Sequence, residues 1–549
     1  MNTSTHTPVL IVGAGPVGLA TAYVLGMHGV RSTVCEQYES INPHPRAHVV
    51  NTRSMELLRA WGIADSIATD AVDPRWMLNI VWRTTVAGEE LGRINLAAGP
   101  QANVERRLDA SPVMVTSCAQ DRVQQHLLDA VRRQGLATVR YGTRVTSVED
   151  TGDRVDVAVE SSSGTEKLHA DYLVAGDGAG GEIRAGLGIG TEGLPEFGHQ
   201  LNIYFHADLT EWMGNDPALL IWALNSESPG VFIGMDGVRR WTFNCAFDPT
   251  AESVAEYTPE RCTELIRTAA GVPDLAVDVQ SVGTWALAAR TATRYRAGRV
   301  FLAGDAAHQF PPTGGLGMNT GLVDADNLAW KLAAVVNGWA PDALLDTYEA
   351  ERRPVAVHNT EHSVANALKM SEAGIGPDTV DVASRLESAD PAVATAERER
   401  LALSIPDQRP HFDDLDQEIG YVYGGDGNPA VVDSVVVGAR LPHGWIECEG
   451  EPISTLDLVR PGFTLVAGPS GVGWAAAFAD LAAGDFPGQA LVVGREIDPG
   501  DADPFGIGEF GAVLIRPDGH VAWHTTALPA DPRSALAAVL AAARSMTAS

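Results

Sequence analysis

The chain has 549 residues, 45% of them hydrophobic and 20% charged, so it is too long for one hydrophobic core and indicates two to four globular domains. Acidic residues outnumber basic ones by 70 to 39, and the net charge of −31 argues against nucleic acid or an anionic membrane as a partner. The five cysteines show neither disulfide nor metal-site spacing, so no metal is expected. Residues 1–8 do not resemble a signal peptide and no apolar run is long enough to span a bilayer, so we expect a cytoplasmic protein.

Residues 9–36 are expected to form a strand, a glycine turn, a helix and a second strand. In the turn, Gly13 allows the tight bend, Gly15 lets the backbone approach a pyrophosphate, and Gly18 permits close packing of the helix. Glu36 ends the second strand at the distance where an acid binds a ribose hydroxyl. This β-α-β context predicts a dinucleotide site, but the motif alone does not separate FAD from NAD. No second complete unit follows, so a nicotinamide cofactor is expected to visit a surface groove only transiently.

Beyond this unit, helices are expected at 52–61 and 120–132, with a strand at 171–176. The two insertions between these elements, 77–112 and 191–284, combine aromatic and β-branched residues in short runs broken by turn residues. Such runs are typical of an antiparallel sheet, which we expect to cover a ligand pocket. Its aromatic residues are expected mainly in the core: Tyr204, Phe205, Trp222, Phe232, Trp241 and Phe243.

The chemistry is expected around residues 300–336. There a strand, Val300–Ala303, is followed by Asp305, which is expected to be buried, then by a loop rich in proline and glycine and a long helix at about Asn319–Val336. The loop lets the backbone approach a ligand closely, and the helix start directs unpaired amides and a positive dipole end toward it. A reduced flavin carries negative charge at its N1/C2=O2 edge, so this stretch is interpreted as one wall of a flavin site. His308 is expected to pack the loop rather than act as a base.

The last part of the chain is expected to be a separate domain. Helical patterns at 345–367 and 384–403 give way to an irregular stretch at 406–429, which indicates a boundary. Short strands at 463–467, 490–493 and 512–515 then precede an alanine-rich closing helix from Pro532.

Several of these sites, taken in order, resemble the fingerprints of the class A FAD-dependent aromatic hydroxylases. The matching residues are the glycine turn, Arg46, Gln120, Asp177-Gly178 and Gly304-Asp305. The match is incomplete after Asp177-Gly178, because Gly181 stands where the family usually has serine, although Arg184 is retained.

The resemblance extends to the phenol and 2,4-dichlorophenol hydroxylases through Gly438–His443 and Ser454–Asp457, and implies an α/β plus α+β fold in three parts. These are a Rossmann-like FAD-binding domain (1–76, 113–190 and 285–405), an antiparallel-sheet substrate domain (77–112 and 191–284) and a thioredoxin-like domain (430–549). The last contains Cys448 as its one cysteine, so it is not expected to exchange dithiols.

The resemblance also implies an activity. FAD, held non-covalently and reduced by NAD(P)H with NADPH favoured, would react with O2 to give a C4a-hydroperoxyflavin that hydroxylates a phenolic or similar electron-rich ring. The expected partner is a small aromatic substrate, and a homodimer is compatible with these features. Two alternatives stay open: a flavoprotein that binds or sequesters an aromatic compound without oxygenating it, and a flavin halogenase, whose Gly-Trp-x-Trp-x-Ile-Pro stretch is not visible here.

The candidate site residues follow from these motifs. The resemblance aligns His48 with an acidic residue of the phenol hydroxylases that is credited with activating the phenol, and histidine has a suitable pKa for a base. A histidine that only makes a structural hydrogen bond is an equal alternative. The expected cofactor-binding residues are Gly13, Gly15, Pro16, Gly18, Glu36, Gln37, Arg46, Gln120, Asp177, Asp305, Pro312, Gly315, Gly317, Met318 and Asn319.

Overall fold

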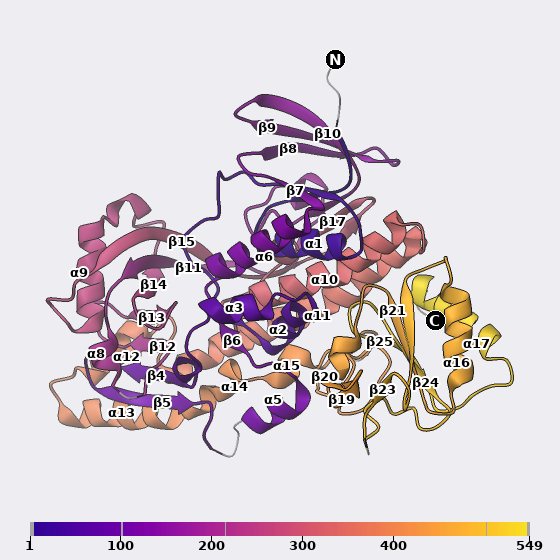
Figure 1. Cartoon of the computed structure of the whole chain (residues 1–549). Helices are drawn as coiled ribbons and strands as arrows, with labels where there is room; N and C mark the ends of the chain where they lie inside the picture. Colours follow the sequence, from indigo (N-terminus) through magenta and orange to yellow (C-terminus); the bar gives the residue numbers. More distant parts are fainter. Residues whose placement is uncertain (1–4, 100–102, 215, 426, 501, 546–549) are drawn as a thin grey trace.

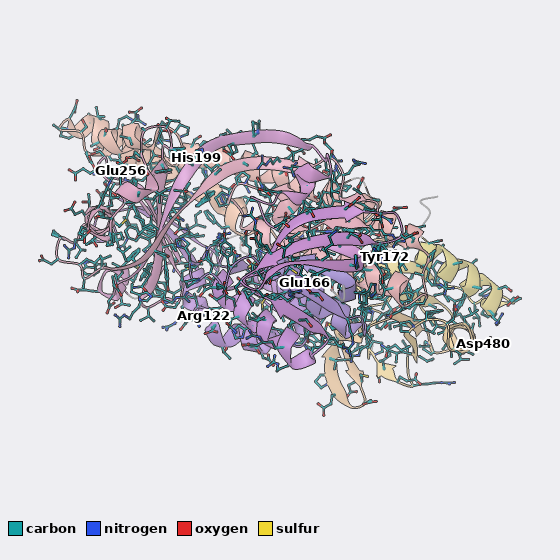
Figure 2. The ribbon with its side chains drawn as sticks, turned by 90° about the horizontal axis from the view of Figure 1, so that it is seen from above. Arg122, Glu166, Tyr172, His199, Glu256 and Asp480 are labelled. Atoms are coloured by element: carbon teal, nitrogen blue, oxygen red, sulfur yellow. The ribbon has the colours of Figure 1, made fainter. Side chains whose placement is uncertain are left out.

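A mainly parallel sheet occupies the middle of the molecule, with an antiparallel sheet at one end and a smaller C-terminal domain at the other (Figure 1). The computed structural model describes residues 5–99, 103–214, 216–425, 427–500 and 502–545. Seen from above, Tyr172 of the parallel sheet lies between His199 of the antiparallel sheet and Asp480 of the C-terminal domain (Figure 2).

The parallel sheet gathers strands that are far apart in the sequence, in the order β16, β17, β10, β1, β2, β7. Its strands and the β8–β9 hairpin that extends β10 are β1 (Thr5–Val12), β2 (Ser32–Cys35), β7 (Ala137–Arg140), β8 (Arg144–Asp150), β9 (Val155–Ser161), β10 (Gly164–Ala175), β16 (Arg296–Ala297) and β17 (Val300–Leu302). Val12, Ala175 and Leu302 are in register at the ends of three neighbouring parallel strands. The segments after them therefore lie side by side at one edge of the sheet.

Three helices that begin close to this edge are α1 (Pro16–Met27), α6 (Gln120–Gln134) and α10 (Leu316–Val336). They share an apolar core with the parallel sheet, in which Leu10, Leu19, Leu127 and Leu322 are buried. α10 begins three residues earlier than the expected start at Asn319, because Gly315 takes a positive φ of 64° and ends the loop. A glycine is favoured at that conformation.

The second sheet is antiparallel except where β12 pairs in parallel with β4. Its order is β18 (His308–Gln309), β15 (Asp278–Ala292), β11 (Thr191–His206), β14 (Arg240–Phe247), β13 (Gly230–Gly234), β12 (Leu220–Ala223), β4 (Asn79–Arg83) and β5 (Glu90–Asn95). One face packs on α9 (Pro259–Ala270), and Phe205, Phe232, Trp241 and Phe243 are buried in that core. The expectation of core aromatics is confirmed for these four residues.

Some helices differ from the expected pattern. The insertions hold α9 and α5 (Val104–Ala110) as well as strands, and the single helix expected at 384–403 is two, α12 (Thr379–Leu386) and α13 (Pro391–Ser404). Asp390 caps α13 by accepting from the Ala392 N–H, and Pro391 takes its first position, so the first helix cannot continue through it. The remaining helices before the C-terminal domain are α2 (Thr52–Ala60), α3 (Ala64–Asp70), α4 (Pro74–Met77), α7 (Ile183–Gly186), α8 (Thr210–Met213), α11 (Asp346–Met370), α14 (Arg409–Phe412) and α15 (Leu415–Ile419). A two-strand ribbon, β3 (Val49–Val50) with β6 (Thr116–Ser117), precedes α2 and α6.

The C-terminal domain contains a four-stranded sheet in the order β22 (Gly488–Val492), β21 (Phe463–Ala467), β24 (Ala512–Ile515) and β25 (Val521–Thr525). Helices α16 (Val472–Ala482) and α17 (Pro532–Ser545) share its apolar core, and β19 (Trp445–Cys448), β20 (Glu451–Ser454) and β23 (Ile497–Asp498) form a second small sheet. Within the described residues, no helix is long and apolar enough to cross a membrane.

The C-terminal domain is joined to α10 and α11 by a buried group of four charged residues, which we call the interdomain charge cluster: Lys331, Glu351, Arg516 and Asp518. Glu351 accepts hydrogen bonds from Lys331 Nζ at 2.8 Å and from Arg516 Nη1 and Nη2 at 2.7 and 2.8 Å. Asp518 accepts from Arg516 and, at 3.1 Å, from Trp330 Nε1. These side chains balance one another's charges where water does not reach.

Stability is expected to fall as the pH drops from about 6.5 to 4.5. Burial lowers the pKa of His28 and His48 to about 4 and that of His411 to about 3. In the unfolded chain these histidines take up protons near pH 6.5, whereas in the folded chain they do so only at lower pH. Protonation between these two pH values therefore favours the unfolded chain. Burial raises the pKa of Asp326 to about 7 and also raises the pKa values of Asp177 and Asp305, which opposes the trend. Burial lowers the pKa values of four further histidines as well, so the lowered histidines outnumber the raised carboxyls: His44, His362, His443 and His520. A thermal-denaturation series should show this fall, and a midpoint that stays constant from pH 6.5 to 4.5 would contradict it.

Candidate active site

The glycine turn between β1 and α1 leaves room for a ligand in front of the helix start. Gly13 has a φ of 99°, and a Cβ there would lie 2.2 Å from the Gly176 carbonyl oxygen. A Cβ on Gly18 would lie 1.9 Å from the carbonyl oxygen of Gly13, whereas one on Gly15 would meet nothing within 4 Å. No side chain fits at Gly13 or Gly18, because the neighbouring backbone is too close. Gly15 instead faces open space at the start of α1, which is what a pyrophosphate site needs.

Glu36 lies beside this turn at the end of β2. Its Oε2 accepts from the Ala14 N–H at 2.7 Å and its Oε1 from the Tyr38 N–H at 3.0 Å. A carboxylate oxygen has further acceptor capacity, so Glu36 can also accept from a ribose hydroxyl. Gln37 is exposed next to it, and Pro16 is buried in the first turn of α1.

The segment that contains Arg46 is tied to the start of α6. The Ala47 N–H donates to Gln120 Oε1 at 3.2 Å, and the Gln120 N–H donates to the Ala47 carbonyl oxygen at 2.8 Å. Gln124, one turn later, donates to the Ala14 carbonyl oxygen at 2.7 Å, which sequence reasoning missed because a glutamine on a helix carries no motif. These bonds tie the backbone next to Arg46 to α6 and tie α6 to the glycine turn, and the Arg46 side chain is exposed.

Asp305 follows β17 and is exposed, although a buried acid was expected from the sequence. Its carboxylate makes no hydrogen bond with any residue that the structure describes, and a Cβ on Gly317 would lie 3.9 Å from Asp305 Oδ1. Desolvation by the surrounding protein raises the pKa of Asp305, against the opposing positive charges of His308 and Arg46. The acid therefore faces an open space bordered by α10 and Arg46.

Asp177, after β10, is held within its own turn. Its Oδ2 accepts from the Ile183 N–H at 3.3 Å, and burial raises its pKa. A Cβ on Gly181 would lie 2.2 Å from the Asp177 carboxyl carbon, so the serine that the family usually has here would require this turn to shift. The departure at Gly181 therefore changes the local packing around Asp177 while leaving its place at the sheet edge.

The start of α10 offers unpaired backbone N–H groups. Gly315 caps the helix without a side-chain hydrogen bond, so the amides of the first turn, which includes Gly317 and Met318, remain free for a ligand, as the loop from Pro312 leads into them. Asn319 does not direct its side chain to this space. Its Oδ1 accepts from the Asn51 N–H at 3.0 Å, and its Nδ2 donates to the carbonyl oxygens of Val49 and Gly315 at 3.0 and 2.7 Å.

His308 supports the same loop from below. Its Nε2 lies 2.7 Å from Asp324 Oδ2, and Arg352 Nε donates to the other oxygen of that carboxylate at 2.8 Å. Both His308 and Asp324 are fully buried. This agrees with the expected packing role of His308.

His48 is buried beside the β3–β6 ribbon. Its Nδ1 lies 3.0 Å from Ser117 Oγ, and its carbonyl oxygen accepts from the Cys118 N–H at 2.7 Å. With a pKa lowered to about 4 by burial, the imidazole is neutral above pH 5. Ser117 was not expected from the sequence, because its strand partner β3 is only two residues long.

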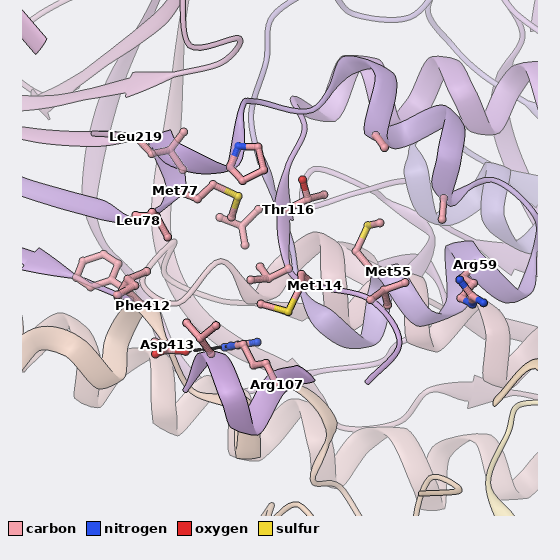
Figure 3. A pocket seen from close by; sticks show the side chains of 18 of the residues that line it. Met55, Arg59, Met77, Leu78, Arg107, Met114, Thr116, Leu219, Phe412 and Asp413 are labelled. Carbon is pink, nitrogen blue, oxygen red and sulfur yellow. Dashed lines mark hydrogen bonds and ion pairs between the residues drawn. The ribbon is translucent and has the colours of Figure 1, made fainter. Parts of the chain in front are cut away.

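A cavity of about 590 Å³, which we call the central cavity, opens between α2–α3, the β3–β6 ribbon and the strands β4 and β12 (Figure 3). Its wall is mainly apolar and includes Met55, Met77, Met114, Leu220 and Phe412. The described lining contains Val49 but not the adjacent His48. Val49 packs against the loop before α10 (residues 305–315), since a Cβ on Gly315 would lie 3.3 Å from Val49 Cβ. The cavity and the loop before α10 thus lie on two sides of one residue.

Comparison with known proteins identifies the class. Residues 6–363 match the FAD binding domain family and residues 434–543 match the aromatic-ring hydroxylase C-terminal family. The chain is 36% identical to 4-methyl-5-nitrocatechol 5-monooxygenase of Burkholderia sp (98% of this chain, 97% of that one). It is also 36% identical to tetracenomycin B2 monooxygenase-dioxygenase of Streptomyces olivaceus (97% and 98%). The crystal structure of the flavin-dependent monooxygenase PieE with FAD and substrate superposes with a TM-score of 0.86 at 30% identity, covering 98% of this chain and 99% of PieE.

The chain belongs to the FAD-dependent aromatic-ring hydroxylases. It is an FAD-dependent monooxygenase that hydroxylates an aromatic ring, and NAD(P)H is its reductant. The expected resemblance to aromatic hydroxylases, including the 2,4-dichlorophenol monooxygenases, and the mixed α/β fold with an FAD-binding domain are confirmed.

Replacing Gly15 by valine is expected to abolish FAD binding. The valine would fill the open space at the start of α1 that a pyrophosphate needs, while the ordinary backbone conformation of Gly15 (φ −67°) leaves folding unaffected. Gly186→Val is the matched control, because Gly186 also has open space around it but lies in α7. FAD content is measured by absorbance after gel filtration. Full occupancy in Gly15→Val would show that the site is misplaced.

Proposed function

We propose that the aromatic substrate of this monooxygenase binds in the central cavity and receives one oxygen atom from O2, with NADPH as the preferred reductant. The observation that carries the proposal is the position of Val49, which lines the cavity and packs against Gly315 at the start of α10. An aromatic ring at the inner end of the cavity would thus lie close to a flavin held by that loop.

The cavity favours a substrate larger than a single ring. Its volume of about 590 Å³ lies within the range of sites that enclose drug-sized ligands, about 300 to 1,000 Å³. Thioether and aliphatic side chains form most of the wall, and methionines adapt to flat ligands of different outline. The relatives range from a monooxygenase named for a nitrocatechol to one named for tetracenomycin B2, and the cavity supports the larger class for this chain.

The cofactor-binding residues expected from the sequence keep their roles in this proposal. Asp305 would accept hydrogen bonds from the ribityl or ribose hydroxyls, and Arg46 would neutralise the pyrophosphate. The side-chain amide of Asn319 would act on the protein rather than on the flavin, because it holds the backbone of Val49 and Gly315 in place. The backbone positions are Gly13, Gly15, Pro16, Gly18, Pro312, Gly315, Gly317 and Met318, and the side chains are Glu36, Gln37, Gln120, Asp177 and Asp305.

His48 is next to the cavity-lining Val49 in the chain but is not in the described lining, so it would ease the proton from a substrate hydroxyl that reaches past Val49. Its bond to Ser117 Oγ fixes the ring plane, and the neutral imidazole is available as an acceptor. A pKa of about 4 makes His48 a weak base. Proton removal by His48 would therefore contribute most if the substrate hydroxyl loses its proton while the ring is being attacked, since the hydroxyl is then most acidic. This supports a supplementary role in which bound FAD supplies the activated oxygen and His48 raises the electron density of the ring.

The C-terminal domain would be thioredoxin-like. The supporting observation is its sheet order: β21 pairs in parallel with β22 across α16, and β24 and β25 follow antiparallel before α17. With Cys448 as its one cysteine it would serve packing or dimer contacts. The domain limits stated from the sequence (1–76, 113–190 and 285–405; 77–112 and 191–284; 430–549) and a cytoplasmic location belong to the same proposal.

The test is a turnover assay of the FAD-loaded protein in ¹⁸O2 with NADPH or NADH. 2,4-Dichlorophenol probes the single-ring class and 1,8-dihydroxyanthraquinone the fused-ring class. One ¹⁸O in the fused-ring product, lost in the cavity-filling variant Leu220→Trp, is the expected result. Hydroxylation that Leu220→Trp and Met55→Trp leave unchanged would overturn the placement of the substrate. Tight binding of both probes without any oxygenated product would point to a sequestering flavoprotein, and a halogenated product in chloride to a halogenase.

A further inference from the structure

Helix α2 stands between the central cavity and the C-terminal domain. Three of its residues contact the C-terminal domain. They are spaced three apart in the sequence, which places them on one side of the helix. Arg53 Nη2 donates to the Asp518 carbonyl oxygen at 2.8 Å, and Glu56 Oε1 lies 3.5 Å from Arg440 Nη1. Arg59 forms a two-point bond with Asp457, from Nε to Oδ1 at 2.8 Å and from Nη2 to Oδ2 at 2.9 Å.

Arg59 is the member of this row that also lines the cavity. In Figure 3 it lies on the side away from Leu219 and Phe412. The lining next to it includes the exposed residues Gly62, Asp65 and Ala68, so the cavity opens to solvent at this end, which we call the cavity mouth. The exposed lining residues Pro74 and Leu78 mark a second open side. Arg59 is therefore placed where a ligand enters.

We propose that Asp457 of the C-terminal domain is a positioning residue for substrate access, because it holds the Arg59 guanidinium against the C-terminal domain and away from the cavity mouth. The proposal rests on the proposed function in taking the central cavity as the substrate site. It gives the C-terminal domain a part in substrate selection, since fused rings need the full width of the mouth and single rings do not.

The alternative partner of Arg59 is already present at the mouth. The pKa of Arg59 is raised first by its hydrogen bond with Asp457, and the negative charge of Asp65 contributes as well. Asp65 lines the cavity and is exposed. When Asp457 no longer offers a carboxylate, the charged end of Arg59 is attracted to Asp65, and the two side chains together narrow the mouth.

Asp457→Asn isolates this effect. Asp457 Oδ2 also accepts from the Ser454 N–H at 2.9 Å, and asparagine keeps an acceptor for that bond while removing the charge. Asp480→Asn is the control, because Asp480 forms an exposed pair with Arg533 in the same domain, away from the cavity. Both variants are first checked for unchanged FAD content and thermal midpoint.

The binding measurement uses the FAD-loaded protein and stopped-flow detection of the flavin spectrum. In Asp457→Asn the association rate of 1,8-dihydroxyanthraquinone should fall about five-fold, which is the scale of one partly exposed ion pair. The association rate of 2,4-dichlorophenol with the same variant should equal the parent rate, and Asp480→Asn should bind both probes at the parent rates. The double variant Arg59→Met/Asp457→Asn should regain the parent rate, because the obstructing side chain is gone. An unchanged rate in Asp457→Asn, or a loss that Arg59→Met does not relieve, overturns the proposal.

A measurement without ligand separates this proposal from the proposed function. Hydrogen exchange of residues 52–60 should rise in Asp457→Asn and not in Asp480→Asn, since α2 loses one of its three contacts with the C-terminal domain. Unchanged exchange there overturns the positioning role even if the cavity is the substrate site. Leu220→Trp, which fills the cavity from the other side, tests the cavity itself: if it leaves the binding of both probes unchanged, the proposed function fails instead.

Discussion

His48→Gln is expected to keep FAD bound and to slow hydroxylation by about 10²- to 10⁴-fold, the usual contribution of a general base. Glutamine retains a polar group that can bond Ser117 Oγ, so the ribbon around it should stay in place. Without help for the hydroxyl proton the aromatic ring is less reactive, and reducing equivalents are lost instead. NADPH oxidation should then continue while product falls and hydrogen peroxide rises, which an oxygen electrode with and without catalase measures.

Ser117→Ala is the companion variant for His48. It removes the bond that orients the imidazole but leaves the imidazole itself, so an intermediate loss of coupling is expected. If His48→Gln keeps the parent ratio of product to NADPH, the catalytic role is wrong. If it loses FAD or stability while the folded fraction stays coupled, His48 is structural.

Glu351→Gln is expected to destabilise the protein by about 3–5 kcal/mol, the usual cost of removing one partner from a buried ion pair. The carboxylate accepts from both Lys331 and Arg516, and although burial alone would raise its pKa, the charges of Arg516 and Lys331 hold that pKa below its usual value. Glutamine would leave the buried Lys331 ammonium without its carboxylate partner and Arg516 with the carboxylate of Asp518 in place of two carboxylates. The C-terminal domain should then unfold in a separate, earlier transition, with a midpoint about 10 °C below that of the parent.

The control for Glu351 is Asp480→Asn, which breaks an exposed pair and should move the midpoint by less than about 2 °C. Differential scanning calorimetry distinguishes one transition from two. A single transition at the parent temperature in Glu351→Gln would show that the cluster does not hold the domains together.

The dinucleotide half of the site could be predicted from sequence because its requirements are local. Gly13 needs a positive φ, Gly18 needs the absence of a side chain, and Glu36 lies a fixed distance along a β-α-β unit. Each requirement leaves a visible residue type at a fixed spacing. Asp305 was predicted for the same reason, since it follows a buried strand and precedes a glycine loop.

The other half could not be predicted, because it depends on contacts between distant segments. Gln124, Ser117 and the clamp role of Asn319 are ordinary residues whose partners are set only when strands and helices meet. Helix α9 is a different kind of miss, because Thr258 and Pro259 at its start and Gly271 at its end are helix signals that the sequence shows, as Asp390 and Pro391 are for α13. The aromatic residues around this segment favoured a prediction of strands, so these helix signals were not used.

The interdomain charge cluster also sets an order of events during synthesis. Arg516 follows Glu351 by 165 residues, so α10 and α11 leave the ribosome before Glu351 can accept its two hydrogen bonds from Arg516. Those helices also form one side of the flavin loop, and they can settle only after the β24–β25 turn has been translated. A nascent chain halted at residue 433 should therefore be cut by protease within 316–370, whereas a chain extended past 525 should resist, which makes flavin loading a late event in the life of each new molecule.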